Sequence, residues 1–359
     1  MADRSSGQKV RLAVVGAGRI GRRHVQLVRS SALSELAAIV DPYPGAAALA
    51  RSAGVAWHAD LEDLLRGEQP DGIIVATPNS QHLAHGLASI AARLPALIEK
   101  PIATSVADGM RLAAAAERSG VPLLIGHHRR HSPILARGQE IVRSGALGDI
   151  VAVLGTALFF KPVDYFESAP WRRMSGGGPI LINMVHEIDD LRVLCGGIKS
   201  VGAMSSSVAR GFPVEDTVAL TIRFASGALG TFLLSDTAAA PWSWEQTSGE
   251  DASYVGYPEE DCYRIIGTNG SLSVPSMRVW AFRGAPSWTE PLEVTTVSLA
   301  RVDPLVRQLE HFCAVVRGDA APLVTAKDAT ETLRVTLAIA QAAKSGTEVS
   351  TSSESPRPG

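Results

Sequence analysis

The chain has 359 residues, of which 46% are hydrophobic and 19% are charged, and its formal net charge is -2 at pH 7. This length exceeds what one hydrophobic core usually serves, so two domains are expected, and the charge gives no basic footprint for nucleic acid. The three cysteines, Cys195, Cys262 and Cys313, are too far apart to indicate disulfides or a zinc site. With no apolar leader or membrane-length stretch, a cytoplasmic protein with no membrane partner is expected.

The first predicted elements are a strand, a glycine-rich turn and a helix. Val10–Val15 is an apolar run typical of a buried strand, and Gly16, Gly18 and Gly21 follow it at GxGxxG spacing. In such a turn the first glycine permits the tight bend, the second lets the backbone approach a pyrophosphate, and the third lets the helix pack on the strand. The helix N-terminus then faces the phosphates.

A second strand, Leu36–Val40, ends at Asp41, about twenty residues beyond the glycines. At this position a carboxylate accepts both hydroxyls of an adenine ribose and repels a 2′-phosphate. The sequence therefore predicts NAD as the cofactor. NADP stays open as the weaker alternative, because Arg22, Arg23 and Arg51 lie nearby in the sequence.

Strands and helices alternate through the rest of the first third, which predicts a parallel sheet with ligands bound beyond the carboxyl ends of its strands. Thr77, Lys100 and His127 follow strand ends as Asp41 does, so one crevice is expected to collect them. The expected strands are Gly72–Ala76, Ala96–Ile98 and Pro122–Ile125, and the expected helices are Gly45–Ala53, Leu61–Arg66, His82–Ala92 and Val106–Ser119.

From about residue 150 the sequence favours a mostly antiparallel sheet, because strand-like runs follow one another with turn residues between them. These runs are Ile150–Phe160, Ser200–Ser207, Thr217–Phe224, Gly230–Ser235, Tyr263–Gly267 and Ser271–Val274; helical segments are Ile180–Leu194, Asp303–Arg317 and Ala326–Lys344. The expected domains are residues 1–126 and 127–344, with the C-terminal helix able to pack back on the first domain. Residues 345–359 are expected to form a flexible tail.

Four segments together resemble one enzyme family: Val14–His24, Ala76–Asn79 with His82, Glu99–Pro101 and Gly126–Arg130. Trp171-Arg172, the glycines Gly176–Gly178 and the run His186–Asp189 continue the likeness. The chain is similar to the glucose-fructose oxidoreductase / inositol dehydrogenase / MocA (Gfo/Idh/MocA) family over nearly its whole length. The resemblance implies an N-terminal Rossmann domain and a C-terminal α/β domain with a large open sheet that builds homodimers or homotetramers. It also implies hydride transfer between NAD(P) and a secondary hydroxyl of a sugar, inositol or related compound.

Oxidation of a secondary alcohol needs a base for the hydroxyl proton and a cation that stabilises the developing alkoxide. Lys100 suits the cationic role, because it follows a strand end and is fixed by Pro101, for which the resemblance suggests a cis peptide bond. His186 is the best candidate for the acid/base, because the ordinary pKa of histidine lies near neutrality. It follows three glycines, a loop expected to let a substrate approach closely. The alternatives are a solvated surface charge for Lys100 and a structural, capped or core histidine for His186.

The chain departs from the family four residues before His186, where relatives that oxidise inositol usually carry an aspartate and this sequence has Ile182. Asn183 lies three residues before His186 and is expected to share a helix face with it. An amide binds a hydroxyl but cannot act as a carboxylate base. The departure leaves His186 as the sole candidate for general base.

Further site residues are expected around these two. His128, Arg129, Lys161, Trp171 and Arg172 are the remaining substrate-binding candidates, since cations around a crevice hold carboxylates or phosphates. Trp242 and Trp244 are equally compatible with ring stacking and with core packing. No metal is expected, because the histidines lack metal-site spacing. The residues assigned to the cofactor are Gly16, Gly18, Arg19, Ile20, Gly21, Asp41, Thr77, Pro78, Asn79, His82, Glu99 and Lys100.

Three functional hypotheses remain open. The leading one is an NAD-dependent dehydrogenase or reductase that acts on a cyclic polyol, sugar derivative or related carbocycle. The second keeps the fold but recycles NAD within each turnover, for epimerisation, elimination or hydrolysis. The third, suggested by Ile182, is a nucleotide-binding sensor that has lost the chemistry.

Overall fold

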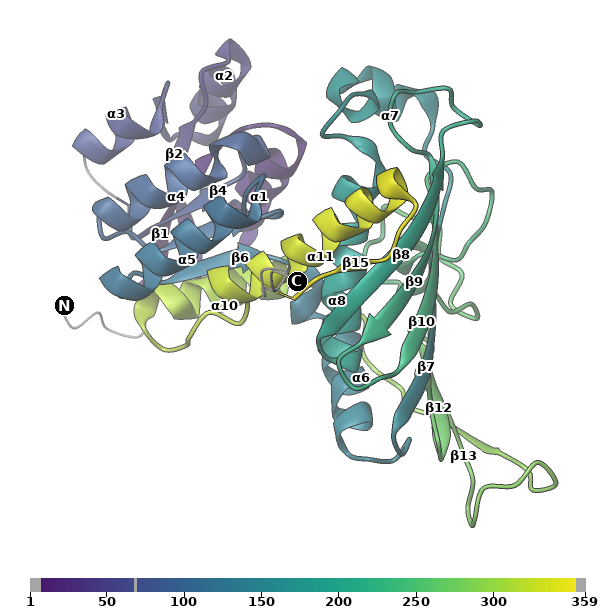
Figure 1. Cartoon of the computed structure of the whole chain (residues 1–359). Coiled ribbons are helices and arrows are strands. Elements are labelled where there is room, and N and C mark those ends of the chain that lie inside the picture. The colour runs from purple at the N-terminus through teal and green to yellow at the C-terminus, as the bar shows by residue number, and fades with distance from the viewer. Residues whose placement is uncertain (1–7, 68–69, 353–359) are drawn as a thin grey trace. The chain divides into compact units, whose positions relative to one another are not determined.

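The structure is a computed structural model that describes residues 8–67 and 70–352. The chain forms two compact units. The first contains the described residues up to Arg130 together with Pro304–Leu333, and the second contains His131–Asp303 and the described residues from Arg334 onward. Each unit has its own sheet, in the purple-to-blue and the teal-to-green parts of Figure 1 respectively.

The first unit is built on a six-stranded sheet of order β3-β2-β1-β4-β5-β6 in which every neighbouring pair is parallel. This confirms the predicted doubly wound sheet. Its strands are β1 Val10–Val15, β2 Ser34–Val40, β3 Ala56–His58, β4 Gly72–Val75, β5 Ala96–Glu99 and β6 Leu123–Gly126. Its α-helices are α1 Arg19–Ser30, α2 Pro44–Ala53, α3 Leu61–Arg66, α4 His82–Ala91, α5 Val106–Ser119 and α10 Pro304–Arg317.

Helix α10 explains why the observed division of the chain differs from the predicted one, which assigned this helix to the C-terminal domain. Its buried face includes Phe312, which is 0% exposed. A Cβ added at Gly72, in β4, would lie 3.0 Å from Val316 and 3.3 Å from Phe312. The helix is therefore part of the core of the parallel sheet, although almost 180 residues separate it from β6.

The second unit is built on a nine-stranded sheet of order β14-β13-β12-β11-β7-β10-β9-β8-β15. Only the β7–β10 pair is parallel among its described strands, which confirms the mostly antiparallel prediction. The strands are β7 Ile150–Leu158, β8 Ile198–Ser206, β9 Thr217–Phe224, β10 Leu229–Ser235, β11 Tyr263–Gly267, β12 Gly270–Val274, β13 Arg278–Ala281, β14 Glu293–Thr296 and β15 Val349–Ser350.

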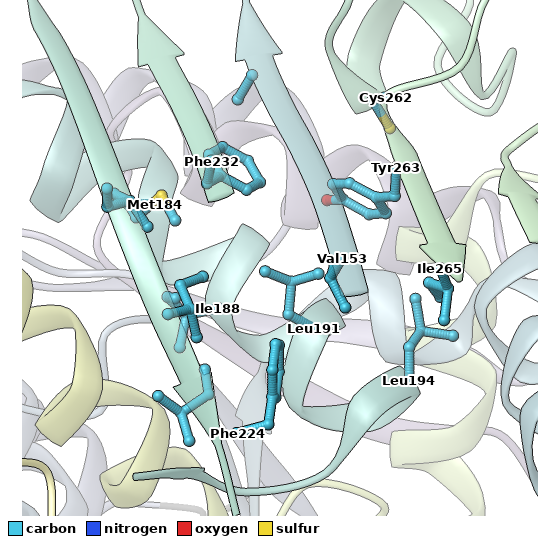
Figure 2. Packing of buried hydrophobic residues seen from close by; sticks show 14 of the residues in the cluster. Val153, Met184, Ile188, Leu191, Leu194, Phe224, Phe232, Cys262, Tyr263 and Ile265 are labelled. Atoms are coloured by element: carbon cyan, nitrogen blue, oxygen red, sulfur yellow. The ribbon is translucent and has the colours of Figure 1, made fainter. Parts of the chain in front are cut away.

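Helices cover one face of this sheet. Figure 2 shows Ile188, Leu191 and Leu194 of helix α8 (Val185–Cys195) among strand residues such as Phe224 and Phe232. Side chains alternate between the two faces of a strand, and β9 alternates buried and exposed residues along most of its length. The remaining helices of this unit are α6 Pro133–Arg143, α7 Val163–Glu167, α9 Trp244–Thr247 and the C-terminal part of α11, Ala326–Ser345.

The predicted flexible tail is wrong for part of its length. Val349–Ser350 pairs with Ser200 and Val201 of β8, and the Thr351 hydroxyl donates a hydrogen bond to the backbone carbonyl of Ile198. The segment after α11 therefore adds an edge strand, β15, to the nine-stranded sheet. The rest of the predicted tail, residues 353–359, lies outside the described residues.

Candidate active site

The three motif glycines have distinct environments in the turn between β1 and α1. Gly16 has a φ of 96°, and a Cβ there would lie 2.6 Å from the Ala76 carbonyl oxygen. A Cβ at Gly21 would lie 1.9 Å from the Gly16 carbonyl oxygen, whereas one at Gly18 would meet nothing within 4 Å. The fold of the turn therefore requires glycine at positions 16 and 21, whether or not a ligand is bound. Gly18 borders open space at the helix N-terminus, so the turn fits a bound pyrophosphate.

Asp41 lies beside this turn at the end of β2. Its Oδ2 accepts a hydrogen bond from the Ala17 amide at 2.7 Å, and its Oδ1 accepts one from the Tyr43 amide at 2.9 Å. The Trp57 indole donates to the Asp41 carbonyl oxygen at 3.0 Å. The carboxylate is therefore held at the edge of the glycine turn, as binding of an adenine ribose requires. Sequence reasoning missed Trp57, which lies 16 residues away from Asp41.

The segments after β4 and β5 are joined by His82 in α4. Its Nδ1 lies 2.8 Å from the Pro101 carbonyl oxygen, and its Nε2 lies 2.9 Å from the Thr77 carbonyl oxygen. Burial lowers the pKa of His82, although both carbonyls and Glu99 act in the opposite direction. Both ring nitrogens are engaged and the residue is 1% exposed. Neither nitrogen is therefore left to make the predicted contact with the cofactor. His82 instead supports the two loops.

Lys100 follows β5, and its peptide bond to Pro101 is cis. Glu99, the last residue of β5, has its Oε1 2.7 Å from Nε2 of His24 in α1, and its Oε2 accepts a hydrogen bond from the Lys100 amide at 3.3 Å. Burial alone would raise the pKa of Glu99, but His24, Lys100 and His128 lower it overall. The predicted cofactor residue Glu99 is thus a buried, ionised anchor for the backbone of Lys100. Sequence reasoning missed its partner, because 75 residues separate the two.

The other expected residues of the first unit lie at or near strand ends. Thr77 follows β4, and its hydroxyl lies 3.1 Å from Nδ1 of His85. Pro78 and Asn79 come next, at the start of a short 3-10 turn, and Arg19 and Ile20 begin α1. His128 and Arg129 lie in a second 3-10 turn after β6, where Arg129 is 2% exposed.

In the second unit, His186 is the second residue of α8 and is 7% exposed. Directly before α8, Ile180–Met184 forms a π-helical turn that contains Ile182 and Asn183. Such turns recur at functional sites. Two of the three preceding glycines face protein, because a Cβ at Gly177 would lie 2.6 Å from the Arg172 carbonyl oxygen and one at Gly178 would lie 2.6 Å from Glu215 Oε1. This corrects the expectation that the loop is open to a substrate; only Gly176 has no atom within 4 Å.

Lys161 and Asn183 are brought together. The Lys161 ammonium donates to Asn183 Oδ1 at 2.5 Å, and it lies 3.7 Å from Asp236 Oδ2. The Arg210 guanidinium donates to the other oxygen of Asp236 at 2.7 Å. Asp236 and Arg210 were missed by sequence reasoning, since nothing local connects them with Lys161.

Arg172 and Trp171 lie in a 3-10 turn, Pro170–Arg173. The Arg172 guanidinium donates to the Tyr165 carbonyl oxygen and lies 3.9 Å from the centre of the Tyr165 ring. Trp171 is 51% exposed. Of the other two tryptophans considered, Trp244 is a core residue whose indole donates to Glu250, whereas Trp242 is 43% exposed.

No group of three or more histidine, cysteine or acidic side chains suited to a metal ion occurs within residues 8–67 and 70–352. In the same part of the chain, no helix is both long enough and apolar enough to cross a membrane.

Both parts of the chain match the models of one known protein family. Residues 10–127 match the model of an oxidoreductase family with an NAD-binding Rossmann fold, and residues 135–273 match the GFO/IDH/MocA C-terminal domain. The chain belongs to the Gfo/Idh/MocA oxidoreductase family. As a member of it, the chain is an NAD-binding oxidoreductase, and the predicted class of NAD-dependent dehydrogenase or reductase is confirmed.

The individual relatives have low to moderate sequence identity with this chain. The rhizopine catabolism protein MocA of Rhizobium meliloti is 35% identical over 191 residues, which are 52% of this chain and 58% of that protein. The scyllo-inositol 2-dehydrogenase (NAD(+)) of Bacillus subtilis is 25% identical over 95% of this chain and 96% of its own length. The WlbA dehydrogenase of Bordetella pertussis, solved with NADH and UDP-GlcNAcA, has a TM-score of 0.76 and 24% identity, over 96% of this chain and 99% of that one.

Proposed function

We propose that this member of the family transfers a hydride between NAD and a secondary hydroxyl or ketone of a cyclic polyol, sugar derivative or related carbocycle. The observation that carries the proposal is the place of Lys100. It follows β5 at the carboxyl edge of the same parallel sheet that presents the glycine turn and Asp41. Ligands of doubly wound sheets bind at this edge. The scyllo-inositol dehydrogenase among the relatives acts on a substrate of this class.

Different residues of the chain bind the cofactor, stabilise the reacting oxygen and transfer the proton. Bound NAD supplies the hydride acceptor for oxidation, and NADH the donor for reduction. Gly18 and the start of α1 hold the pyrophosphate, and Asp41 holds the adenine ribose. Lys100 donates a hydrogen bond to the reacting oxygen and stabilises its negative charge. His186 takes the hydroxyl proton during oxidation and returns it during reduction.

The test is a spectrophotometric screen of sugars, inositols, sugar acids and shikimate-like carbocycles with NAD and NADP in parallel. The expected result is turnover with NAD that falls by at least about a hundredfold in Lys100→Met and in His186→Ala, since a positioned acid/base contributes at least that much. Lys199→Met, on the exposed side of β8, is the matched control and retains turnover. Full activity in either site variant contradicts the assignment.

A second candidate, an NAD-binding sensor without chemistry, is suggested by Ile182, which stands where the family resemblance implies an aspartate in relatives that oxidise inositol. The same screen separates the two, because turnover of any substrate excludes the sensor. NAD that stays bound through purification, with product formed but no net NADH released, would instead favour internal recycling of the cofactor.

The protein is a homodimer or homotetramer joined through the outer face of its nine-stranded sheet. This face carries exposed apolar side chains on several strands: Leu154 on β7, Leu229 and Leu233 on β10, Met204 on β8, Trp280 on β13 and Val294 on β14. Strand register places Leu233 opposite Ala219, and Ala219 opposite Met204, on one face. Apolar patches of this kind mark interfaces between proteins.

Light scattering after size-exclusion chromatography tests this assembly. The double variant Leu154→Arg, Leu233→Arg is expected to elute as a monomer, because it places two charges in the contact. Met110→Arg, on the exposed face of α5, is expected to keep the wild-type mass. A monomeric wild-type protein would rule out the proposed assembly.

A further inference from the structure

His24 is a polar residue on the buried face of α1. The same face carries Gly21, Val25 and Val28, at the spacing of one helical stripe, and His24 is 1% exposed. Gly18 is the N-cap of the helix, so His24 lies about 9 Å along α1 from the end that fits the pyrophosphate. An imidazole buried in an apolar stripe needs a hydrogen-bond partner inside the protein.

The partner of His24 is Glu99, which belongs to a strand on which the site depends. Nε2 of His24 lies 2.7 Å from Oε1 of Glu99, and the two side chains are 2% and 8% exposed. The other carboxylate oxygen, Oε2, accepts the hydrogen bond from the Lys100 amide at 3.3 Å. The two oxygens of one carboxylate therefore connect α1 with the backbone of Lys100.

Strand β6 limits where this carboxylate lies. Gly126 is paired with Glu99 in the parallel sheet. A Cβ at Gly126 would lie 3.1 Å from the Cα of Glu99 and 3.2 Å from its Oε2, closer than ordinary van der Waals contact. The absence of a side chain at position 126 thus leaves room for the carboxylate, and three elements together (α1, β5 and β6) define its place.

A gain in stability alone does not account for a buried pair of this kind. Apolar residues of similar volume are often as stabilising as a buried charged pair, because removing charges from water is costly. Burial raises the pKa of Glu99, but His24, Lys100 and His128 lower it overall, so the carboxylate is ionised at neutral pH. An ionised carboxylate only accepts hydrogen bonds, and Nε2 of His24 is therefore the donor. What this contact supplies is a short, directed connection between two elements.

The geometry points to His24 as a positioning residue for Lys100: by donating to Glu99, it fixes the backbone of Lys100 relative to α1, the helix that fits the cofactor pyrophosphate. The inference rests on the proposed function, in which Lys100 binds the reacting oxygen. That reaction needs the lysine at a fixed place relative to the bound cofactor, and a misplacement of about 1 Å costs about a hundredfold in rate. His24 acts through Glu99 and contacts neither substrate nor cofactor.

The first test compares two substitutions of His24, on the substrate found in the screen. Phenylalanine keeps a ring but has no donor, so His24→Phe is expected to lower kcat by about ten- to a hundredfold, with KM and the Kd for NAD within about threefold of the wild type. Glutamine places an N–H donor near the position of Nε2, so His24→Gln is expected to keep kcat within about threefold. His311→Phe, in α10, is the matched control and keeps the wild-type kcat. Wild-type kcat in His24→Phe, or equal losses in both His24 variants, overturns the inference.

Repeating His24→Phe in Lys100→Met separates the positioning of Lys100 from general damage to the site. Residues that act as a unit are not additive, so His24→Phe is expected to change kcat by less than about twofold once Lys100 is absent. A further loss of about tenfold in that protein contradicts the inference. If His24→Phe does not fold, Glu99→Gln, which removes the charge at the other end of the contact, takes its place in both proteins.

NMR of protein with isotope-labelled dimethyl groups on its lysines gives a readout that does not depend on turnover. The Lys100 signal is identified by its loss in Lys100→Met. In the complex with NAD, this signal is expected to move in His24→Phe and to coincide with the wild-type signal in His24→Gln. An unchanged signal in His24→Phe overturns the inference. If the signal moves but Lys100→Met keeps full turnover, His24 still positions the lysine, and the proposed role of Lys100 is what fails.

Discussion

The three motif glycines look alike in sequence but serve different purposes. At Gly21 an added methyl group would collide with the Gly16 carbonyl oxygen, whereas at Gly18 it would enter open space beside the helix N-terminus. The lack of a side chain at Gly21 is needed for folding, and the lack of one at Gly18 is needed for binding of the cofactor.

We therefore expect Gly21→Ala and Gly18→Ala to separate stability from cofactor binding. Overpacking at Gly21 should cost about 1–3 kcal/mol or more of unfolding free energy, because backbone cannot yield as a side chain does. Gly18→Ala should melt at the wild-type temperature, yet its Kd for NAD should rise by about tenfold or more, equivalent to about 1.4 kcal/mol. Thermal melting and NADH fluorescence titration measure the two effects. Equal behaviour of the two variants would contradict this division.

At the scale of elements, the sequence predicted correctly those strands and turns that are defined by residues close together in the chain. The apolar run of β1, the glycines after it and the acid after β2 are local signals, and each lies where it was predicted. Short strands such as β3 and β15 were missed, because pairing with a neighbour defines them more than their own residues do. The partnership of Lys161 with Asp236 was missed for the same reason, since contacts between residues distant in sequence leave no local signal.

The link between α1 and β5 is such a long-range contact, and it predicts a pH dependence. The pKa of Glu99 lies below its ordinary value of 4.5, so its ionised form stabilises the fold at neutral pH. This contribution is complete above about pH 4.5 and is lost as the pH falls through the lower pKa of the folded state. We expect Glu99→Gln to lower the free energy of unfolding by about 1–3 kcal/mol at pH 7, since it disrupts a buried charged hydrogen bond.

Urea denaturation at pH 7 and at pH 4 measures this link. The difference between the wild type and Glu99→Gln should shrink as the pH falls. Glu62→Gln, with a side chain that is 86% exposed, should match the wild type at both values. A difference that does not vary with pH would show that the carboxylate charge is not what stabilises the contact.

At the scale of the whole molecule, each unit is assembled from segments that are not contiguous. The first unit depends on α10, which follows strands β7–β14 of the second unit's sheet in the chain. Integrity of the cofactor site near the N-terminus should therefore depend on a residue about 300 positions away from the glycine turn.

Phe312→Ala tests this dependence in the full-length protein. Phe312 is 0% exposed and packs near Gly72 of β4, so the cavity left by its ring should cost about 3–5 kcal/mol. We expect the first unit to open more often, with faster proteolysis within residues 8–130 and weaker NAD binding, while the second unit keeps its wild-type resistance. Leu323→Ala, which removes a side chain that is 48% exposed, should leave both properties unchanged. Limited proteolysis with mass spectrometry, with and without NAD, distinguishes the outcomes: unchanged cleavage and NAD affinity in Phe312→Ala would mean that the Rossmann sheet is stable without the packing of α10.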